Sequence, residues 1–225
     1  MKKSITLISV LIISVLSITL LSSFKENNNQ STQDELTEQE KKATEWVSSL
    51  NLEDKEKEQK VIKVVAAHLT TIRNWHNEHP ASTVPEGINP KTGEQLSELD
   101  RQIIADSSMP KEVHESLMSG LRADLTEEQV EAILDKYTVG KVDFTMRGYH
   151  AIVPDLTDEE AAKLLGYLKE AREMAVDYKS MKEISAIFEI YKTKCEQYLI
   201  SNGRDWRALY KAFVKSLKEQ KDKSK

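Results

Sequence analysis

The sequence predicts an all-α protein, a multi-helix bundle of about seven to nine helices with one irregular or short extended segment near residues 139–154. Three observations support this fold class. Apolar residues recur every three or four positions along most of the chain, which is the spacing of one helix face. Ser, Thr or Asp precedes several of these stretches, often with Glu or Gln three positions later. Gly and Pro are few, with 7 Gly and 5 Pro among 225 residues, which argues against collagen-like and wholly disordered chains.

The N-terminus has the layout of a secretory signal. Two lysines precede an uncharged stretch from Ile5 to Leu21, and two serines follow it. We predict a signal peptide over residues 1–23, then a flexible polar spacer over residues 24–36. The alternative is an uncleaved anchor, which is the only membrane contact that we expect. The protein is therefore predicted to be exported, either to the periplasm or to the cell surface.

A single helical domain is expected over residues 37–217, followed by a polar tail over residues 218–225. The first helix begins at a capping box that starts with Thr37. The apolar positions of the first two helices have helical spacing: Ala43, Trp46, Val47 and Leu50, then Val61, Ile62, Val65, Leu69, Ile72 and Trp75. Pro80 ends the second helix, and a loop rich in Pro and Gly extends to Gly93.

The remaining helices are predicted in the same way. Two of them begin with the same Asp-Leu-Thr-x-Glu pattern, at Thr126 and at Thr157, which lie 31 positions apart. This repeat indicates either a duplicated helical hairpin or convergent capping, and we favour convergence because two copies are too few for a repeat protein. The other apolar faces are Leu96, Leu99, Ile103 and Ile104; Val113, Leu117 and Leu121; Ile184, Ile187, Phe188, Tyr191, Cys195, Tyr198 and Leu199; and Trp206, Leu209, Tyr210, Phe213 and Leu217.

One stretch, Val139 to Pro154, breaks the helical rhythm. Here Val142, Phe144 and Met146 alternate with polar residues, and a period of two indicates an extended segment or an irregular connection. Loops on a rigid scaffold often carry function. This segment is therefore the first place to look for a binding site.

Two sets of aromatic, basic and amide side chains are the candidate ligand-binding residues: Arg147, Tyr149 and His150 in the irregular segment, and Arg73, Asn74 and Trp75 near the end of the second helix. Proteins bind sugars by stacking aromatic rings on their C–H faces and by hydrogen bonds from planar charged groups. The alternative for each residue taken singly is ordinary packing, with the two aromatic rings in the core and the arginines at the surface.

No catalytic residue, metal site or cofactor is predicted. His76 and His79 could share a metal on one helix face, but the metalloprotease pattern of two His four residues apart around a Glu is missing. We expect them to be solvated histidines at the end of a helix. Cys195 is expected to be a small buried apolar residue. Acidic residues are abundant, so a glycosidase-like acid pair is conceivable, although no spacing identifies it.

Charge argues against nucleic acid as a partner. Without residues 1–23 the chain carries 30 basic and 37 acidic side chains. An acidic surface with mixed charges is poorly suited to a phosphate backbone.

Four motifs make residues 37–201 resemble an uncharacterised family of exported Bacteroidetes proteins, the domain of unknown function 3826. The motifs are Ala43–Val47 with Leu50–Leu52; Leu125–Glu131; Phe144–Tyr149 continuing to Val153–Thr157; and Ala171–Asp177 with Phe188, Tyr191, Lys192, Tyr198 and Leu199. The resemblance implies a helical exported domain that is regarded as sugar-binding and is often found beside polysaccharide-degradation machinery. It implies no catalytic residues.

The leading functional hypothesis is a non-catalytic carbohydrate-binding protein in polysaccharide uptake or sensing, with an oligo- or polysaccharide as ligand. One alternative is a carbohydrate-active enzyme with two carboxylates facing each other across a cleft, roughly 5–10 Å apart. Another is an interaction module of the cell envelope, which would expose an apolar patch and lack a deep pocket.

Overall fold

The computed structural model describes residues 38–90 and 92–223, and the predicted signal peptide and spacer lie outside these residues. Within these ranges the chain forms nine α-helices and no strand, which confirms the all-α fold class. The elements are, in order, a helix over residues 38–48, α2 (Lys55–Glu78), a 3-10 turn (Ala81–Thr83), α3 (Glu98–Asp106), α4 (Lys111–Asp124), α5 (Glu127–Thr138), α6 (Lys141–Ile152), α7 (Asp158–Ala175), α8 (Met181–Ser201) and α9 (Trp206–Lys223). None of these helices is long and apolar enough to span a bilayer.

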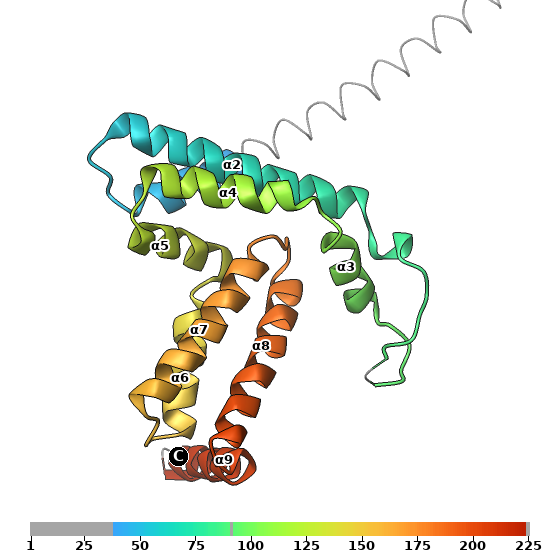
Figure 1. The fold of residues 1–225 in the computed structure, drawn as a ribbon, viewed down its shortest axis with the longest axis vertical. Coiled ribbons are helices and arrows are strands. Elements are labelled where there is room, and N and C mark those ends of the chain that lie inside the picture. The colour runs from blue at the N-terminus through green and yellow to red at the C-terminus, as the bar shows by residue number, and fades with distance from the viewer. Residues whose placement is uncertain (1–37, 91, 224–225) are drawn as a thin grey trace, which may run out of the picture.

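The N-terminal half is built on α2 and α4, which lie side by side across one end of the molecule (Figure 1). Their apolar faces, together with the helix over residues 38–48 and α5, enclose a first core. Leu121 of α4 and Val65 of α2 are completely buried there. The predicted helical spacing of these segments thus corresponds to one continuous apolar surface.

The C-terminal half is a hairpin of α7 and α8, covered by α6 and closed at its far end by α9 (Figure 1). It has its own core, which includes Leu164, Leu168 and Leu199. The turn between α7 and α8 reaches the α2–α4 pair, where Val176 joins the first core. Because this turn is where the two halves meet, it also positions the polar groups described below.

Most of residues 139–154 is helical, since α6 spans Lys141–Ile152, so the predicted irregular or extended segment is wrong. Val139 and Gly140 adopt left-handed backbone conformations that end α5, and α6 begins at the next residue. On this helix Val142 and Tyr149 are buried, whereas Phe144 is 71% exposed. The alternation of apolar and polar residues therefore arose because one exposed phenylalanine lies on the solvent side of a helix.

Capping chemistry starts several helices. Thr126 and Thr157 each accept a hydrogen bond from the backbone three residues on, and the side chains of Gln129 and Glu160 complete both capping boxes. The repeated Asp-Leu-Thr-x-Glu pattern therefore marks two helix starts. Helix α9 continues to Lys223 and so includes residues 218–223 of the predicted polar tail.

Helices α2 and α4 pack tightly against each other at Gly120. A Cβ atom at this position would lie 2.8 Å from both Cγ atoms of Val64, nearer than real Cβ contacts allow. At Gly166 in α7, by contrast, a Cβ atom would meet nothing within 4 Å. Glycine is therefore required at residue 120 by packing and not by backbone conformation.

We expect the substitution Gly120→Val to lower the free energy of unfolding by about 2 kcal/mol, because the added methyl groups force α2 and α4 apart. The same substitution at Gly166 should change it by less than about 0.5 kcal/mol, because valine meets no neighbour there. Urea denaturation followed by circular dichroism measures both. Equal effects of the two substitutions would show that the α2–α4 contact tolerates a side chain.

Candidate functional site

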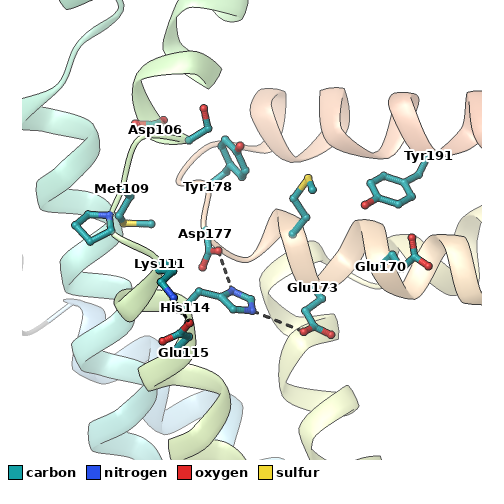
Figure 2. Close-up of a pocket in the computed structure, with 13 residues that line it drawn as sticks. Asp106, Met109, Lys111, His114, Glu115, Glu170, Glu173, Asp177, Tyr178 and Tyr191 are labelled. Carbon is teal, nitrogen blue, oxygen red and sulfur yellow. Dashed lines mark hydrogen bonds and ion pairs between the residues drawn. The ribbon is translucent and has the colours of Figure 1, made fainter.

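A pocket of about 710 Å³ lies where the α7–α8 turn meets α3 and α4 (Figure 2). We call it the junction pocket. His114 and Glu115 of α4 line one side, and Glu173 of α7 and Asp177 of the turn line another. Asp177 follows Glu173 by four residues, just beyond the C-terminal end of α7. Tyr178 and Tyr191 also line the pocket.

Four polar side chains form a continuous chain of contacts that begins in this pocket. His114 Nδ1 lies 2.8 Å from Asp177 Oδ2, and Asp177 Oδ1 lies 3.1 Å from Nε2 of the buried His68. His68 Nδ1 lies 3.1 Å from the hydroxyl of Tyr137. Burial raises the pKa of Tyr137 well above its usual value, so this hydroxyl stays protonated and donates a hydrogen bond to Nδ1 of His68. The contacts then fit a His68 tautomer whose Nε2–H donates to Asp177.

At the pocket wall, His114 and Asp177 each favour the charged form of the other. The hydrogen bond to Asp177 raises the pKa of His114 above 6.5, with a further contribution from the nearby Glu173. Burial disfavours the charged form of Asp177, but the hydrogen bonds from His114 and His68, together with the charge of His114, outweigh it and lower its pKa. His114 Nε2 lies 3.7 Å from Glu173 Oε1 (Figure 2). An imidazole held in this way can donate or accept a proton at the pocket wall.

A second hollow, of about 740 Å³, lies among α6, α8 and α9, and we call it the aromatic groove. Phe144, Arg147 and Tyr149 come from α6. Helix α8 contributes Glu189, Lys192 and Glu196, and α9 contributes Trp206, Tyr210 and Phe213. Three neighbouring helices therefore contribute rings and charged groups to one concave surface.

Three rings that line the aromatic groove contact one another. Trp206 stacks on Tyr210 with ring centroids 6.2 Å apart and planes 30° apart, and Tyr149 lies 5.6 Å from Trp206. Tyr149 is buried and donates its hydroxyl to the backbone carbonyl of Lys192, whereas Phe144 and Tyr210 are exposed. Burial, together with the nearby Glu189, raises the pKa of Glu196 on the facing wall. Exposed rings beside charged groups suit a ligand with both apolar faces and hydroxyl groups.

The structure separates the two sets of predicted binding residues. Arg147 and Tyr149 line the aromatic groove, and His150 is an exposed neighbour on α6. The other set lies on α2 beside α3, in the other half of the molecule (Figure 1). There Arg73 is buried and donates to Oδ1 of Asn74, at 3.1 and 2.7 Å.

Trp75 is held by structural contacts. Its Nε1 donates to the carbonyl of Ala105 at 3.2 Å, and its ring stacks on His79 with centroids 3.9 Å apart.

The two histidines near the end of α2 have different surroundings. His76 lies 2.8 Å from the buried Asp106, so the expectation that both histidines are merely solvated is wrong.

The model of a protein family, the protein of unknown function DUF3826, matches residues 36–219. The chain belongs to the DUF3826 family. No curated protein sequence matches it significantly.

Two motifs of this DUF3826 chain supply its candidate sites. The motif Phe144–Tyr149 provides one wall of the aromatic groove, and the motif Ala171–Asp177 provides Glu173 and Asp177 to the junction pocket. Sequence reasoning missed the site role of Asp177 and His114 because they lie 63 residues apart, on different elements. It also placed Trp206 and Tyr210 only on the buried face of a helix, although they line the groove.

Proposed function

We propose that this DUF3826 protein is an exported carbohydrate-binding protein that holds an oligo- or polysaccharide in the aromatic groove. The observation that carries the proposal is the exposed ring of Tyr210, stacked on Trp206 and backed by the buried Tyr149, beside Arg147. The basic and apolar N-terminus supports export to the periplasm or cell surface.

The composition of the groove suits a sugar. A pyranose ring has an apolar face of C–H groups that packs on an aromatic ring, and hydroxyl groups around its edge. In the groove, Tyr210 offers an exposed ring, and the charged groups of Arg147 and Glu189 lie around it on neighbouring helices. Charge-assisted hydrogen bonds from such groups fix the orientation of hydroxyls. A groove of about 740 Å³ has room for a short oligosaccharide.

Removing the Tyr210 ring or the Arg147 side chain should weaken carbohydrate binding in the aromatic groove. We expect Tyr210→Ala to weaken the affinity about tenfold through the lost stacking contact. Arg147→Ala should weaken it about tenfold to a hundredfold through lost charge-assisted hydrogen bonds. A panel of plant and host polysaccharides tested by affinity electrophoresis would identify the ligand. Calorimetry with its oligosaccharides then measures the two variants.

Arg207→Ala is the matched control, because this arginine is exposed on α9 and does not line the groove. It should bind like the wild type. Retention by no polysaccharide in a broad panel would contradict the proposed function. Binding that is unchanged in both Tyr210→Ala and Arg147→Ala would place the sugar elsewhere on the molecule.

The pairing of His114 with Asp177 favours a second candidate, acid–base chemistry on a carbohydrate in the junction pocket. Glu115 of α4 and Glu170 and Glu173 of α7 add carboxylates to the same pocket. Release of new reducing ends from a bound polysaccharide, abolished by His114→Ala and preserved in Arg207→Ala, would favour an enzyme over a binding protein. Absence of such release would leave the groove as the functional site.

A further inference from the structure

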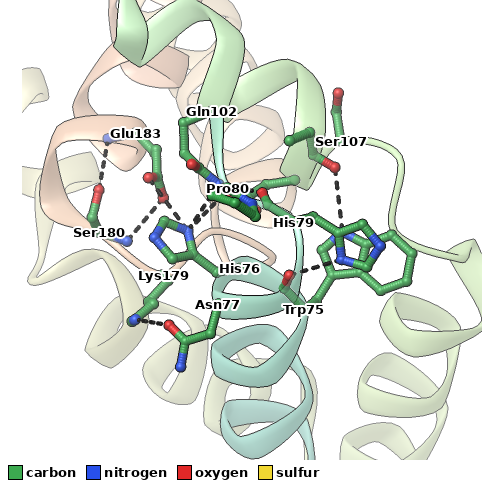
Figure 3. Close-up of polar contacts among 12 residues, drawn as sticks. Trp75, His76, Asn77, His79, Pro80, Gln102, Ser107, Lys179, Ser180 and Glu183 are labelled. Atoms are coloured by element: carbon green, nitrogen blue, oxygen red, sulfur yellow. Dashed lines mark hydrogen bonds and ion pairs between the residues drawn. The ribbon is translucent and has the colours of Figure 1, made fainter. Parts of the chain in front are cut away.

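Three side chains that are far apart in the sequence converge where α2, α3 and the start of α8 meet. They are His76, Asp106 and Glu183, and one donor atom from each lies within 4.8 Å of the other two. His76 Nδ1 lies 2.8 Å from Asp106 Oδ2 and 3.6 Å from Glu183 Oε1. Figure 3 shows His76 pointing toward Glu183, with Gln102 of α3 beside them.

The cluster is buried, and its charges do not balance. Asp106 and Glu183 are 4% and 3% exposed. Within the described ranges, His76 is the only basic group that forms an ion pair with either carboxylate. Even a protonated imidazole would leave one net negative charge among these groups, whereas a divalent cation with a neutral imidazole would leave none. Buried carboxylates are normally paired or coordinate a metal ion.

Hydrogen bonds orient both carboxylates toward this point. Gln102 Nε2 donates to Asp106 Oδ1 at 3.1 Å, and the backbone N–H of Ser180 donates to Glu183 Oε2 at 3.0 Å. The other oxygen of each carboxylate, Oδ2 of Asp106 and Oε1 of Glu183, faces His76. Outer contacts of this kind hold ligating carboxylates in place at metal sites.

The spacing of the donor atoms suits a transition-metal ion. Neighbouring ligands on an ion with bonds of about 2.1 Å are about 3.0–3.4 Å apart. The separations of 2.8 and 3.6 Å from His76 Nδ1 bracket this range. One imidazole nitrogen and two carboxylate oxygens favour Zn²⁺ or a similar ion over Mg²⁺, which prefers oxygen ligands alone. The partly exposed His76, with 21% of its side chain accessible, leaves a route to solvent.

We propose that His76, Asp106 and Glu183 form a binding site for a divalent transition-metal ion such as Zn²⁺. The ion joins α2, α3 and α8. Because Asp106 also lines the junction pocket, the ion fixes one wall of that pocket as well.

The test is a calorimetric titration of the EDTA-stripped and dialysed protein with ZnCl₂, and with MgCl₂ for comparison. The wild type should bind one Zn²⁺ per chain and bind Mg²⁺ far more weakly. Glu183→Gln and His76→Gln should each weaken Zn²⁺ binding about a hundredfold or more, since loss of a ligand costs at least as much as loss of an outer contact. The melting temperature should rise with Zn²⁺ in the wild type and stay unchanged in Glu183→Gln and His76→Gln.

The variants are chosen so that folding is retained. A glutamine at position 183 can still accept the Ser180 N–H, as Gln129 accepts that of Thr126 in the capping box of α5. Glu189→Gln on the same helix and His150→Gln are matched controls at exposed sites, and both should bind Zn²⁺ like the wild type.

Two results would overturn the proposal. One is the absence of saturable Zn²⁺ binding by the folded wild type. The other is Zn²⁺ affinity in Glu183→Gln that equals that of Glu189→Gln, which would place the ion at other residues. If circular dichroism shows that His76→Gln does not fold, the comparison of the two glutamate variants decides alone.

Discussion

Replacing Asp177 with alanine is expected to lower the free energy of unfolding by about 3 kcal/mol near pH 6. Asp177 accepts hydrogen bonds from two imidazoles, at 2.8 Å from His114 and 3.1 Å from His68. The side chain of His68 is only 2% exposed, so water cannot replace the lost acceptor. Removal of one carboxylate therefore leaves a buried polar group without its partner, which costs more than the loss of a surface ion pair.

The pH dependence of this loss follows from the two pKa shifts. The pKa of His114 is raised above 6.5, so its contribution is complete below that pH and is lost as the pH rises through the raised value. The pKa of Asp177 is lowered below 3.8, so its contribution is present above that pH and is lost as the pH falls through the lowered value. The pair should therefore stabilise the fold most between about pH 4 and 6.5.

Urea denaturation at several pH values measures the difference between the wild type and Asp177→Ala. Asp177→Asn should retain part of the stability and lose most of the pH dependence, because it keeps an acceptor but not the charge. Asp143→Ala, at an exposed position in the first turn of α6, should cost less than about 1 kcal/mol. A difference that stays constant as the pH is raised above 6.5 and lowered below 3.8 would contradict the ion pair of His114 and Asp177.

Replacing Arg172 with alanine is expected to lower the free energy of unfolding by a similar amount, about 3 kcal/mol. Only 4% of the Arg172 side chain is exposed, and its guanidinium joins α7 to α5 through Asp135 at 2.8 Å and Glu131 at 3.6 Å. Alanine leaves a cavity and removes a contact between the two halves of the molecule. The measurement is again urea denaturation at neutral pH.

Replacing Arg172 with methionine separates the contribution of side-chain packing to stability from the contribution of charge. The Nε of Arg172 is buried without a hydrogen-bond partner in the described part of the chain, so methionine removes an unsatisfied donor while filling most of the volume. Arg172→Met should therefore cost about 1 kcal/mol. Arg122→Ala is the control, because Arg122 is 48% exposed and its ion pair with Glu127 should contribute less than about 0.5 kcal/mol. An equal loss in the alanine and methionine variants would mean that the charge, and not the volume, stabilises the α5–α7 contact.

The helices were predictable where apolar spacing and capping agreed. Thr126 caps the start of α5, and the buried residues from Val130 to Tyr137 have helical spacing, so this helix forms as expected. The prediction for residues 139–154 was wrong because the exposed ring of Phe144 was counted with the buried positions. A single apolar residue on the solvent side is enough to turn a helical pattern into an apparent alternation.

The candidate sites were predictable only in part. Arg147 and Tyr149 were selected from local clustering, and they line the aromatic groove because both lie on α6. Trp75 was selected for the same reason, yet its ring stacks on His79 and its Nε1 bonds to Ala105. Local clustering does not distinguish a ring that faces a groove from one that packs under a neighbouring helix.

The order of amphipathic segments and their caps determined by itself that the chain is all-α and where most helices begin, because helical spacing and capping involve residues within a few positions of one another. Only the tertiary structure decided that the α7–α8 turn brings Asp177 to His68 and His114, and that His76 meets Asp106 and Glu183. Such contacts depend on how whole helices pack. Packing depends on the fit of complete faces, which the spacing within any one segment does not encode.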